Sequence, residues 1–182
     1  KGDEAKIKSE DWTESDTRTR LIDVLLREAG WDLAAEDVQE FKITGLPKPA
    51  FPEGWGKADY VLWDNDHRPL AVIEAKKTIK SPEVGKHQGK LYADGLERLY
   101  DQRPIIYYSN GFSTWCWEDR FYPERKVMGF HTKAELQWML QRNQTRKHPL
   151  SVEPNRSIVG GQGRTYQLHA INRTMKRFCD KD

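Results

Sequence analysis

The chain has 182 residues, a length typical of one domain or slightly more, and 32% of them are charged. Seven Trp, seven Tyr and six Phe supply enough apolar surface for a packed core, which excludes a chain that is disordered as a whole. The formal net charge of +2 is unevenly distributed, because residues 1–140 carry a net −4 and residues 141–182 a net +6. The basic C-terminal segment is consistent with a polyanionic or acidic partner.

Other patterns exclude several kinds of site and location. Cys116 and Cys179 lie far apart and belong to no C-x-x-C pair, so neither a disulfide scaffold nor a cysteine-rich zinc site is expected. The five histidines lack H-x-x-x-H spacing, which argues against a histidine-based metal site. No apolar run approaches the ~18 residues of a membrane span, and the polar start is unlike a signal peptide. We therefore expect a cytoplasmic protein that makes no membrane contact.

Hydrophobic spacing predicts the first elements. Residues 13–29 have the periodicity of an amphipathic helix, and Gly30 is a natural end for it. Residues 37–43 predict a short strand, and residues 45–56, rich in Pro and Gly, predict a loop.

Two neighbouring segments predict a β-hairpin. Residues 57–63 alternate between apolar and polar side chains, and residues 69–77 contain an unbroken apolar run from Leu70 to Ile73. Such a run is typical of a strand that is buried on both faces. Because the polar turn between the two segments is short, the strands should pair antiparallel.

The rest of the chain predicts helices and strands in alternation. We expect a helix over 86–100, two strands on either side of Asn110-Gly111, a strand over 126–130, a helix over 132–143 and a last helix over 164–179. This succession predicts an α/β fold with a mixed β-sheet flanked by helices.

Three charged residues stand at costly positions in the predicted hairpin. Asp59 interrupts the first strand, whereas Glu74 and Lys76 directly follow the apolar run of the second. Glu74 and Lys76 are two residues apart and share one face of the sheet, while Ala75 points away. A hairpin centred on the polar turn places Asp59 opposite Val72 to Glu74, within about 5 Å of that strand.

Two carboxylates this close repel each other unless a cation lies between them. Mg²⁺ is the natural cation for oxygen ligands, and it polarises a phosphoryl oxygen and activates a bound water. An ammonium such as that of Lys76 can orient the water and offset the charge that develops on the phosphate. The sequence thus predicts a phosphodiester-hydrolysing site; a purely structural ion pair of Lys76 with Asp59 or Glu74 is the alternative.

The segments GKADYVLW, PLAVIEAKK and GKHQGKLYA resemble the core of the PD-(D/E)XK nucleases. Asp59 matches the aspartate of that motif and Glu74-Ala75-Lys76 its (D/E)XK, although Ala58 stands where the family name has proline. The resemblance implies a restriction-endonuclease-like fold. It also implies that Asp59, Glu74 and Lys76 are catalytic and that the Ala75 carbonyl adds a metal ligand.

Gln88 and Tyr92 resemble the Q-x-x-x-Y of the RecB-like branch of these nucleases. The two residues are four apart on the predicted helix and share one of its faces. The resemblance implies that the pair positions DNA at the active site. The alternative is that Gln88 is a surface residue and Tyr92 a core residue.

The beginning of the chain, WTESDTRTRLIDVLLREAGW, resembles the opening of the restriction (motor) subunit of type I restriction-modification enzymes. Related nucleases often have a metal-binding carboxylate on this first helix. Glu14 is the candidate and Asp16 the second choice, although both could equally be helix N-terminal charges that complement the dipole.

The end of the chain supports the same resemblance. The residues RTYQ followed by Ala170-Ile171 resemble the Q-motif that opens a superfamily-two helicase motor, in which the glutamine, here Gln167, reads the adenine of ATP. No G-x-G-K-[ST] follows. We therefore expect an endonuclease domain over 1–144, a linker over 145–163 and the first helix of an otherwise absent motor over 164–182.

Together these observations predict a Mg²⁺-dependent endonuclease domain of a type I restriction enzyme. By resemblance, its partners are double-stranded DNA and the modification and specificity subunits, and ATP serves only the absent motor. Two alternatives remain open: a stand-alone repair or resolvase-type nuclease, and a non-catalytic DNA-binding or docking module on the same fold.

Overall fold

The computed structural model describes residues 18–77, 84–145 and 165–179. The chain divides into two compact units, Lys1–Gln141 and Arg142–Asp182, and each is treated by itself. The helices are η1 (Arg18–Ile22), α2 (Asp23–Glu28), α3 (Val84–Tyr100), α4 (Lys133–Thr145) and α5 (Thr165–Cys179). The strands are β1 (Gln39–Thr44), β2 (Trp55–Trp63), β3 (Pro69–Ala75), β4 (Ile105–Ser109), β5 (Thr114–Trp117) and β6 (Arg125–Val127).

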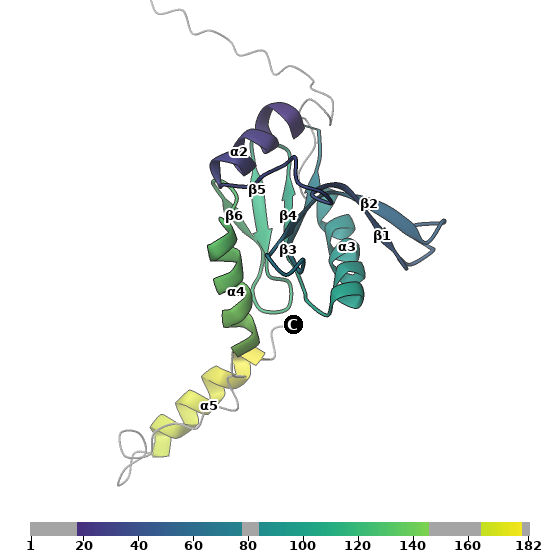
Figure 1. Cartoon of the computed structure of the whole chain (residues 1–182). Coiled ribbons are helices and arrows are strands. Elements are labelled where there is room, and N and C mark those ends of the chain that lie inside the picture. Colours follow the sequence, from purple (N-terminus) through teal and green to yellow (C-terminus); the bar gives the residue numbers. More distant parts are fainter. Residues whose placement is uncertain (1–17, 78–83, 146–164, 180–182) are drawn as a thin grey trace, which may run out of the picture. The chain divides into compact units, whose positions relative to one another are not determined.

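The first unit is built on a six-stranded sheet whose strands lie side by side in chain order, β1 to β6 (Figure 1). All neighbouring strands are antiparallel except β3 and β4, which are parallel. A parallel pair needs a crossover connection, and α3 lies in that connection. The prediction of an α/β fold with a mixed sheet is confirmed.

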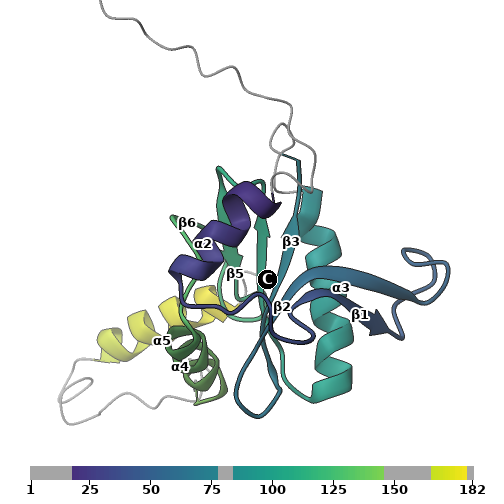
Figure 2. The same ribbon diagram turned by 45° about the horizontal axis from the view of Figure 1, so that its top comes forward.

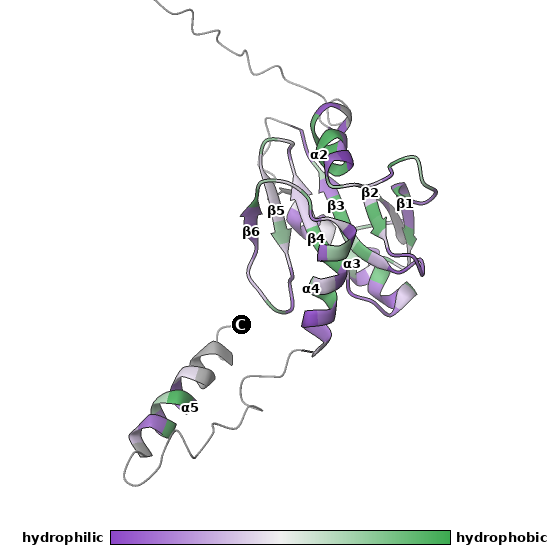
Figure 3. Cartoon of the chain, turned by 60° about the vertical axis from the view of Figure 1, so that its left-hand side comes forward, coloured by the Kyte–Doolittle hydropathy of each residue, from purple (hydrophilic) through white to green (hydrophobic). Residues whose placement is uncertain are grey.

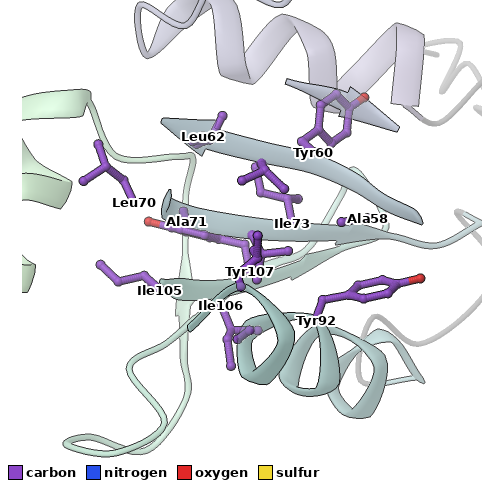
Figure 4. Close-up of a cluster of buried hydrophobic side chains, with 14 of the residues drawn as sticks. Ala58, Tyr60, Leu62, Leu70, Ala71, Ile73, Tyr92, Ile105, Ile106 and Tyr107 are labelled. Carbon is purple, nitrogen blue, oxygen red and sulfur yellow. The ribbon is translucent and has the colours of Figure 1, made fainter. Parts of the chain in front are cut away.

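Helices cover both faces of this sheet (Figure 2). Helix α3 packs so closely on one face that a Cβ added at Gly89 would lie 3.0 Å from Ile106 Cγ2. Helix α2 lies against the other face, where the hydroxyl of Tyr60 donates a hydrogen bond to Asp23 Oδ1 over 2.6 Å. Figure 4 shows the strands between these two helices, with Tyr60 and Tyr92 on opposite sides of the sheet. The sheet is therefore the buried central layer of this unit.

The predicted β2–β3 hairpin is confirmed. Tyr60 pairs with Ile73 and Val61 with Val72 in an antiparallel register. Every residue of β3 is buried, as the unbroken apolar run predicted. The strand ends at Ala75, two residues before the predicted end.

The structure agrees only in part with the predicted helix over 13–29. Residues 13–17 lie outside the described residues, and the first described turn, Arg18–Ile22, is π-helical rather than α-helical. Apolar spacing does not distinguish the two, because Ile22 and Leu26 are buried in either case. The predicted end is confirmed, since α2 stops at Glu28 and Gly30 follows with a φ of +85°.

The second unit contains α5, which lies within the predicted helix over 164–179. Figure 3 shows hydrophobic and hydrophilic segments alternating along α5, as in an amphipathic helix. Among the described residues, none of the helices is both long and apolar enough to span a membrane.

Candidate active site

The β2–β3 hairpin places two carboxylates on one face of the sheet. Its register pairs Tyr60 with Ile73, and continuing that register by one residue sets Asp59 opposite Glu74. Side chains of directly opposed residues share a face in an antiparallel pair. Asp59 Oδ2 also accepts a hydrogen bond from the Ala75 backbone N–H over 2.7 Å, which ties the aspartate to the end of β3.

Glu74 is a buried charge that has a cationic neighbour. Glu74 is only 2% exposed, and its Oε1 lies 2.6 Å from Lys76 Nζ. Burying a carboxylate without a partner is costly, so the ammonium stabilises the ionised form at this position. Lys76 follows the last residue of β3 and lies on the same face as Glu74, as predicted.

Helix α3 begins directly over Glu74. A Cβ added at Gly85 would lie 3.1 Å from Glu74 Cγ and 3.4 Å from Tyr108 Cβ. These contacts are tighter than ordinary packing, so glycine at position 85 lets the first turn of α3 approach the strand ends. The sequence interpretation did not single out Gly85, and a glycine near a predicted helix start gives little signal by itself.

Gln88 and Tyr92 connect α3 to the lysine. Gln88 Oε1 accepts a hydrogen bond from Lys76 Nζ over 3.3 Å, and Gln88 Nε2 donates one to the Tyr92 hydroxyl over 2.9 Å. Burial raises the pKa of Tyr92 to about 12, opposed by the hydrogen bond from Gln88 and increased by the charges of Glu74, Asp59 and Glu40. The phenol is thus neutral, and its oxygen fixes which end of the Gln88 amide faces the lysine.

The Tyr92 ring is held from the other side by the loop before β2. Its centroid lies 5.4 Å from that of Phe51, and the residue is 2% exposed. Tyr92 is therefore a core residue, as one alternative had it, but its hydroxyl belongs to the hydrogen-bonded chain that leads to Glu74. Gln88 is only partly exposed.

Two residues that the sequence interpretation did not assign complete the arrangement. In the β1–β2 register, Gln39 faces Tyr60 and Phe41 faces Ala58, which sets Glu40 opposite Asp59. Glu40, Asp59 and Glu74 therefore follow one another across three strands. The register of β1 depends on the ten-residue connection to β2, so no sequence spacing predicts this row.

Arg18 lies between two of these carboxylates. Its Nη1 donates to Asp59 Oδ1 over 3.2 Å and also to Glu40 Oε1, and the guanidinium lies 5.3 Å from the centre of the Tyr60 ring. Burial opposes the charge, but hydrogen bonds to Tyr60 and Glu40 and the charge of Asp59 outweigh it and raise the pKa of Arg18. In the sequence, Arg18 belongs to the opening segment WTESDTRTRLIDVLLREAGW, which carries the resemblance to the restriction subunit.

Not every predicted site residue is brought together here. Glu14 and Asp16 lie outside the described residues. Gln167 lies on α5, in the second unit, so nothing in the first unit's geometry bears on it.

The donor set fits a magnesium ion. Among the described ranges, no group of three or more His, Cys, Asp or Glu side chains is arranged to hold a metal. Mg²⁺ does not require one, since it commonly takes one or two carboxylates and keeps several waters. Asp59 and Glu74 supply those carboxylates, and the backbone carbonyl of Ala75 is a third oxygen close by in the chain.

Chemically, the arrangement combines paired carboxylates with an ammonium. A divalent ion at the carboxylates polarises a phosphoryl oxygen and lowers the pKa of a bound water. The ammonium of Lys76 lies next to that position and can offset developing negative charge. No nucleophilic side chain is needed for hydrolysis of a phosphodiester by this set.

Comparisons with known proteins show which proteins the chain is similar to. No family model matches the chain. It is 30% identical over 189 aligned residues to the type I restriction enzyme EcoAI endonuclease subunit of Escherichia coli, an alignment that covers 94% of the chain and 22% of the subunit. A solved fragment of a putative HsdR subunit of a type I restriction enzyme from Vibrio vulnificus superposes with a TM-score of 0.57 and 24% identity, over 81% of the chain and 30% of the fragment.

The match to the solved fragment shows that the chain and this fragment share a fold. The chain spans about a fifth of the length of the curated relative that it matches. It is thus similar, over nearly its whole length, to one part of the endonuclease subunit of a type I restriction enzyme.

Proposed function

We propose that the chain is a Mg²⁺-dependent endonuclease domain of a type I restriction enzyme's motor subunit and that it hydrolyses phosphodiester bonds of double-stranded DNA. One observation carries the proposal: Asp59 accepts a hydrogen bond from the Ala75 N–H, directly after Glu74 on β3, and the Lys76 ammonium lies 2.6 Å from Glu74. The similarity to a type I endonuclease subunit supports the same reaction.

In this proposal Asp59, Glu74 and the Ala75 carbonyl hold the ion, which supplies an activated water and polarises the scissile phosphate. The Ala75 N–H keeps the Asp59 carboxylate aimed at the strand ends. Lys76 orients the attacking water and offsets charge on the phosphate. Whether Glu14 or Asp16 adds a ligand is a separate prediction.

Gln88 and Tyr92 hold the lysine in place. The hydrogen bonds from Lys76 to Gln88 and from Gln88 to Tyr92 support this role, because they restrict the ammonium to the side of Glu74. A contact of the same pair with DNA, which the family resemblance implies, would be added to this role and would not replace it.

The wider assignments also remain proposals. We propose a nuclease domain over 1–144, a linker over 145–163 and a helicase Q-motif helix over 164–182, in which Gln167 serves adenine binding in a complete motor. We further propose a cytoplasmic complex with modification and specificity subunits, with ATP used only by the motor. The similarity to subunits of type I restriction enzymes supports membership in a restriction enzyme.

Metal binding tests the proposal directly. Adding Mn²⁺ or Mg²⁺ should raise the melting temperature of the chain, and Asp59→Ala should abolish the rise. Asp66→Ala is the matched control, because Asp66 is an exposed carboxylate in the turn of the same hairpin. An equal rise in the Asp59 variant and the wild type would refute the assigned site.

Cleavage tests the role of the lysine. In a restriction complex that contains the whole subunit, Lys76→Ala should stop DNA cleavage while ATP hydrolysis continues. Loss of both activities together would contradict the assignment.

A non-catalytic DNA-binding or docking module is the second candidate. The ion pairs of Lys76 with Glu74 and of Arg18 with Asp59 favour it, since they compensate both carboxylates within the protein itself. That candidate predicts no metal-dependent rise in melting temperature. A stand-alone repair or resolvase-type nuclease predicts the rise, together with cleavage by the chain in the absence of other subunits.

A further inference from the structure

Arg18 shares one nitrogen between two carboxylates that differ in environment. Its Nη1 donates to Asp59, whose side chain is 14% exposed, and to Glu40, whose side chain is 49% exposed. The two acceptors come from the neighbouring strands β1 and β2. A small rotation of the guanidinium is therefore enough to favour one partner over the other.

Asp59 is the residue at which this pairing conflicts with metal binding. Its Oδ2 already accepts the Ala75 N–H, and its Oδ1 faces Arg18. A divalent cation at Asp59 and Glu74 would approach the same carboxylate that the guanidinium contacts. The guanidinium and the cation are both positively charged, so they repel each other when both lie beside Asp59. Salt screens this repulsion little, because the groups are partly buried.

We infer that Arg18 is a positioning residue that competes with the divalent cation for Asp59, and that Glu40 is the alternative partner that keeps Arg18 when the cation is bound. The inference rests on the proposed function, because it takes Asp59 as a metal ligand. Arg18 thereby weakens metal binding, and Glu40 strengthens it without touching the metal.

The two residues should shift metal affinity in opposite directions. Removing the guanidinium in Arg18→Gln should tighten Mn²⁺ binding about tenfold, because one repelling unit charge beside a dication is lost. Glu40→Gln should weaken binding by roughly threefold or more, since Arg18 is then left with Asp59 as its carboxylate partner. Arg18→Lys should lie near the wild type, because the positive charge is retained.

Isothermal titration calorimetry with Mn²⁺ on the 182-residue chain measures these shifts. Arg27→Gln is the control, because Arg27 lies on the adjacent helix α2 and pairs with Asp23 instead of Asp59. Its affinity should match the wild type. Melting temperatures without metal show whether each variant is folded, and Glu40→Gln, which should weaken binding, keeps the inference testable if Arg18→Gln is unstable.

A double-variant cycle separates a direct contact from a general field effect. The weakening by Glu40→Gln should shrink clearly in the Arg18→Gln background, because Glu40 acts through Arg18. Equal effects of Glu40→Gln in both backgrounds would refute the assigned partnership. Unchanged or weaker Mn²⁺ binding by folded Arg18→Gln would refute the competition.

These outcomes are distinguishable from failure of the proposed function. If Mn²⁺ binds the wild type and Asp59→Ala equally, the metal site itself is wrong and this inference is refuted with it. If binding depends on Asp59 but not on Arg18, only this inference is refuted.

Discussion

Two clusters of ionised side chains lie near opposite ends of α3, and they differ in construction. Near its start, Glu74, Asp59 and Glu40 come from three adjacent strands, with Lys76 and Arg18 as cations. Near its end, the guanidinium of Arg103 is surrounded by three carboxylates, one of which, Glu97, also pairs with Arg120 over 2.6 Å. Arg103 contacts Asp119 through Nε over 3.1 Å and through Nη2 over 2.5 Å, and its Nη1 contacts Asp94 and Glu97 over 2.5 and 3.2 Å.

The difference lies in what fixes the carboxylates. In the Arg103 cluster they come from α3 and from the residues after β5, and the cation organises them. In the candidate site the strand register fixes them before any cation is considered, and a backbone N–H orients Asp59. Carboxylates that are held together by a cationic side chain leave no room for a second cation. Carboxylates that the strands hold in place can instead bind one cation in exchange for another. This distinction, more than the number of charges, separates a structural ion network from a candidate metal site.

The largest expected effect is on the structural network. Arg103→Ala should lower the free energy of unfolding by about 3 kcal/mol or more, because it leaves the buried carboxylate of Asp119 without its bidentate partner. Arg18→Ala should cost only about 1 kcal/mol, because Glu40 is half exposed to water. Urea denaturation of both variants measures the contrast. Equal losses would mean that the two clusters do not differ as described.

A smaller effect is expected where α3 meets Glu74. Gly85→Ala should destabilise the protein by about 1–3 kcal/mol, because the added methyl group overpacks the contact with Glu74 and Tyr108. It should also reduce the metal-dependent rise in melting temperature, since Glu74 must move. Gly129→Ala is the matched control, because nothing lies within 4 Å of a Cβ at that position. A Gly85 variant as stable and as responsive to metal as the control would refute the close packing.

Gln88→Ala should have a third, mainly functional effect. Losing its two hydrogen bonds should cost about 1 kcal/mol of stability. Cleavage by the complete enzyme should fall far more, because Lys76 loses its second acceptor and Tyr92 its donor, whereas Mn²⁺ affinity should change little. The neighbouring exposed residue offers the control variant His87→Ala. A large loss of Mn²⁺ affinity in Gln88→Ala would instead place Gln88 at the metal.

The sequence predicted the parts of the site that depend on local spacing. A short turn and an unbroken apolar run were enough to predict the pairing of β2 with β3, and hence Asp59 opposite a position from Val72 to Glu74. The i, i+4 spacing placed Gln88 beside Tyr92. The roles of these residues remain proposals.

Contacts between distant segments could not be predicted in the same way. The row of Glu40 with Asp59 depends on the β1–β2 register, and the position of Arg18 depends on how the first helix crosses the sheet. The aromatic residues of β4 and β5 show the same limit. Strand alternation by itself favours core packing for Tyr107, Tyr108, Trp115 and Trp117. Both tyrosines are fully buried, but both tryptophans are partly exposed, and Trp117 lies 4.6 Å from Lys86 Nζ. The alternation of side chains along a strand predicts on which face of the sheet each one lies, but it does not predict which element covers that face.

The smallest effect is expected at His131, which is half-buried on the face of the sheet opposite α3 and, unlike both clusters, is neutral when folded. Its Nδ1 forms a hydrogen bond with the Tyr107 hydroxyl, and burial lowers the pKa of the ring below its ordinary value. The unfolded chain therefore binds this proton more readily than the folded one. Stability from this group is complete above pH ~6.5 and falls as the pH drops through that value towards the lowered pKa.

His131→Gln should remove this part of the pH dependence. Its free energy of unfolding should decrease less than that of the wild type between pH 7.5 and 5.5, because glutamine can still accept from Tyr107 but binds no proton. The exposed His87→Gln serves as the control and should keep the wild-type slope. If the His131 variant also keeps that slope, the pH dependence does not come from His131, and the prediction is refuted.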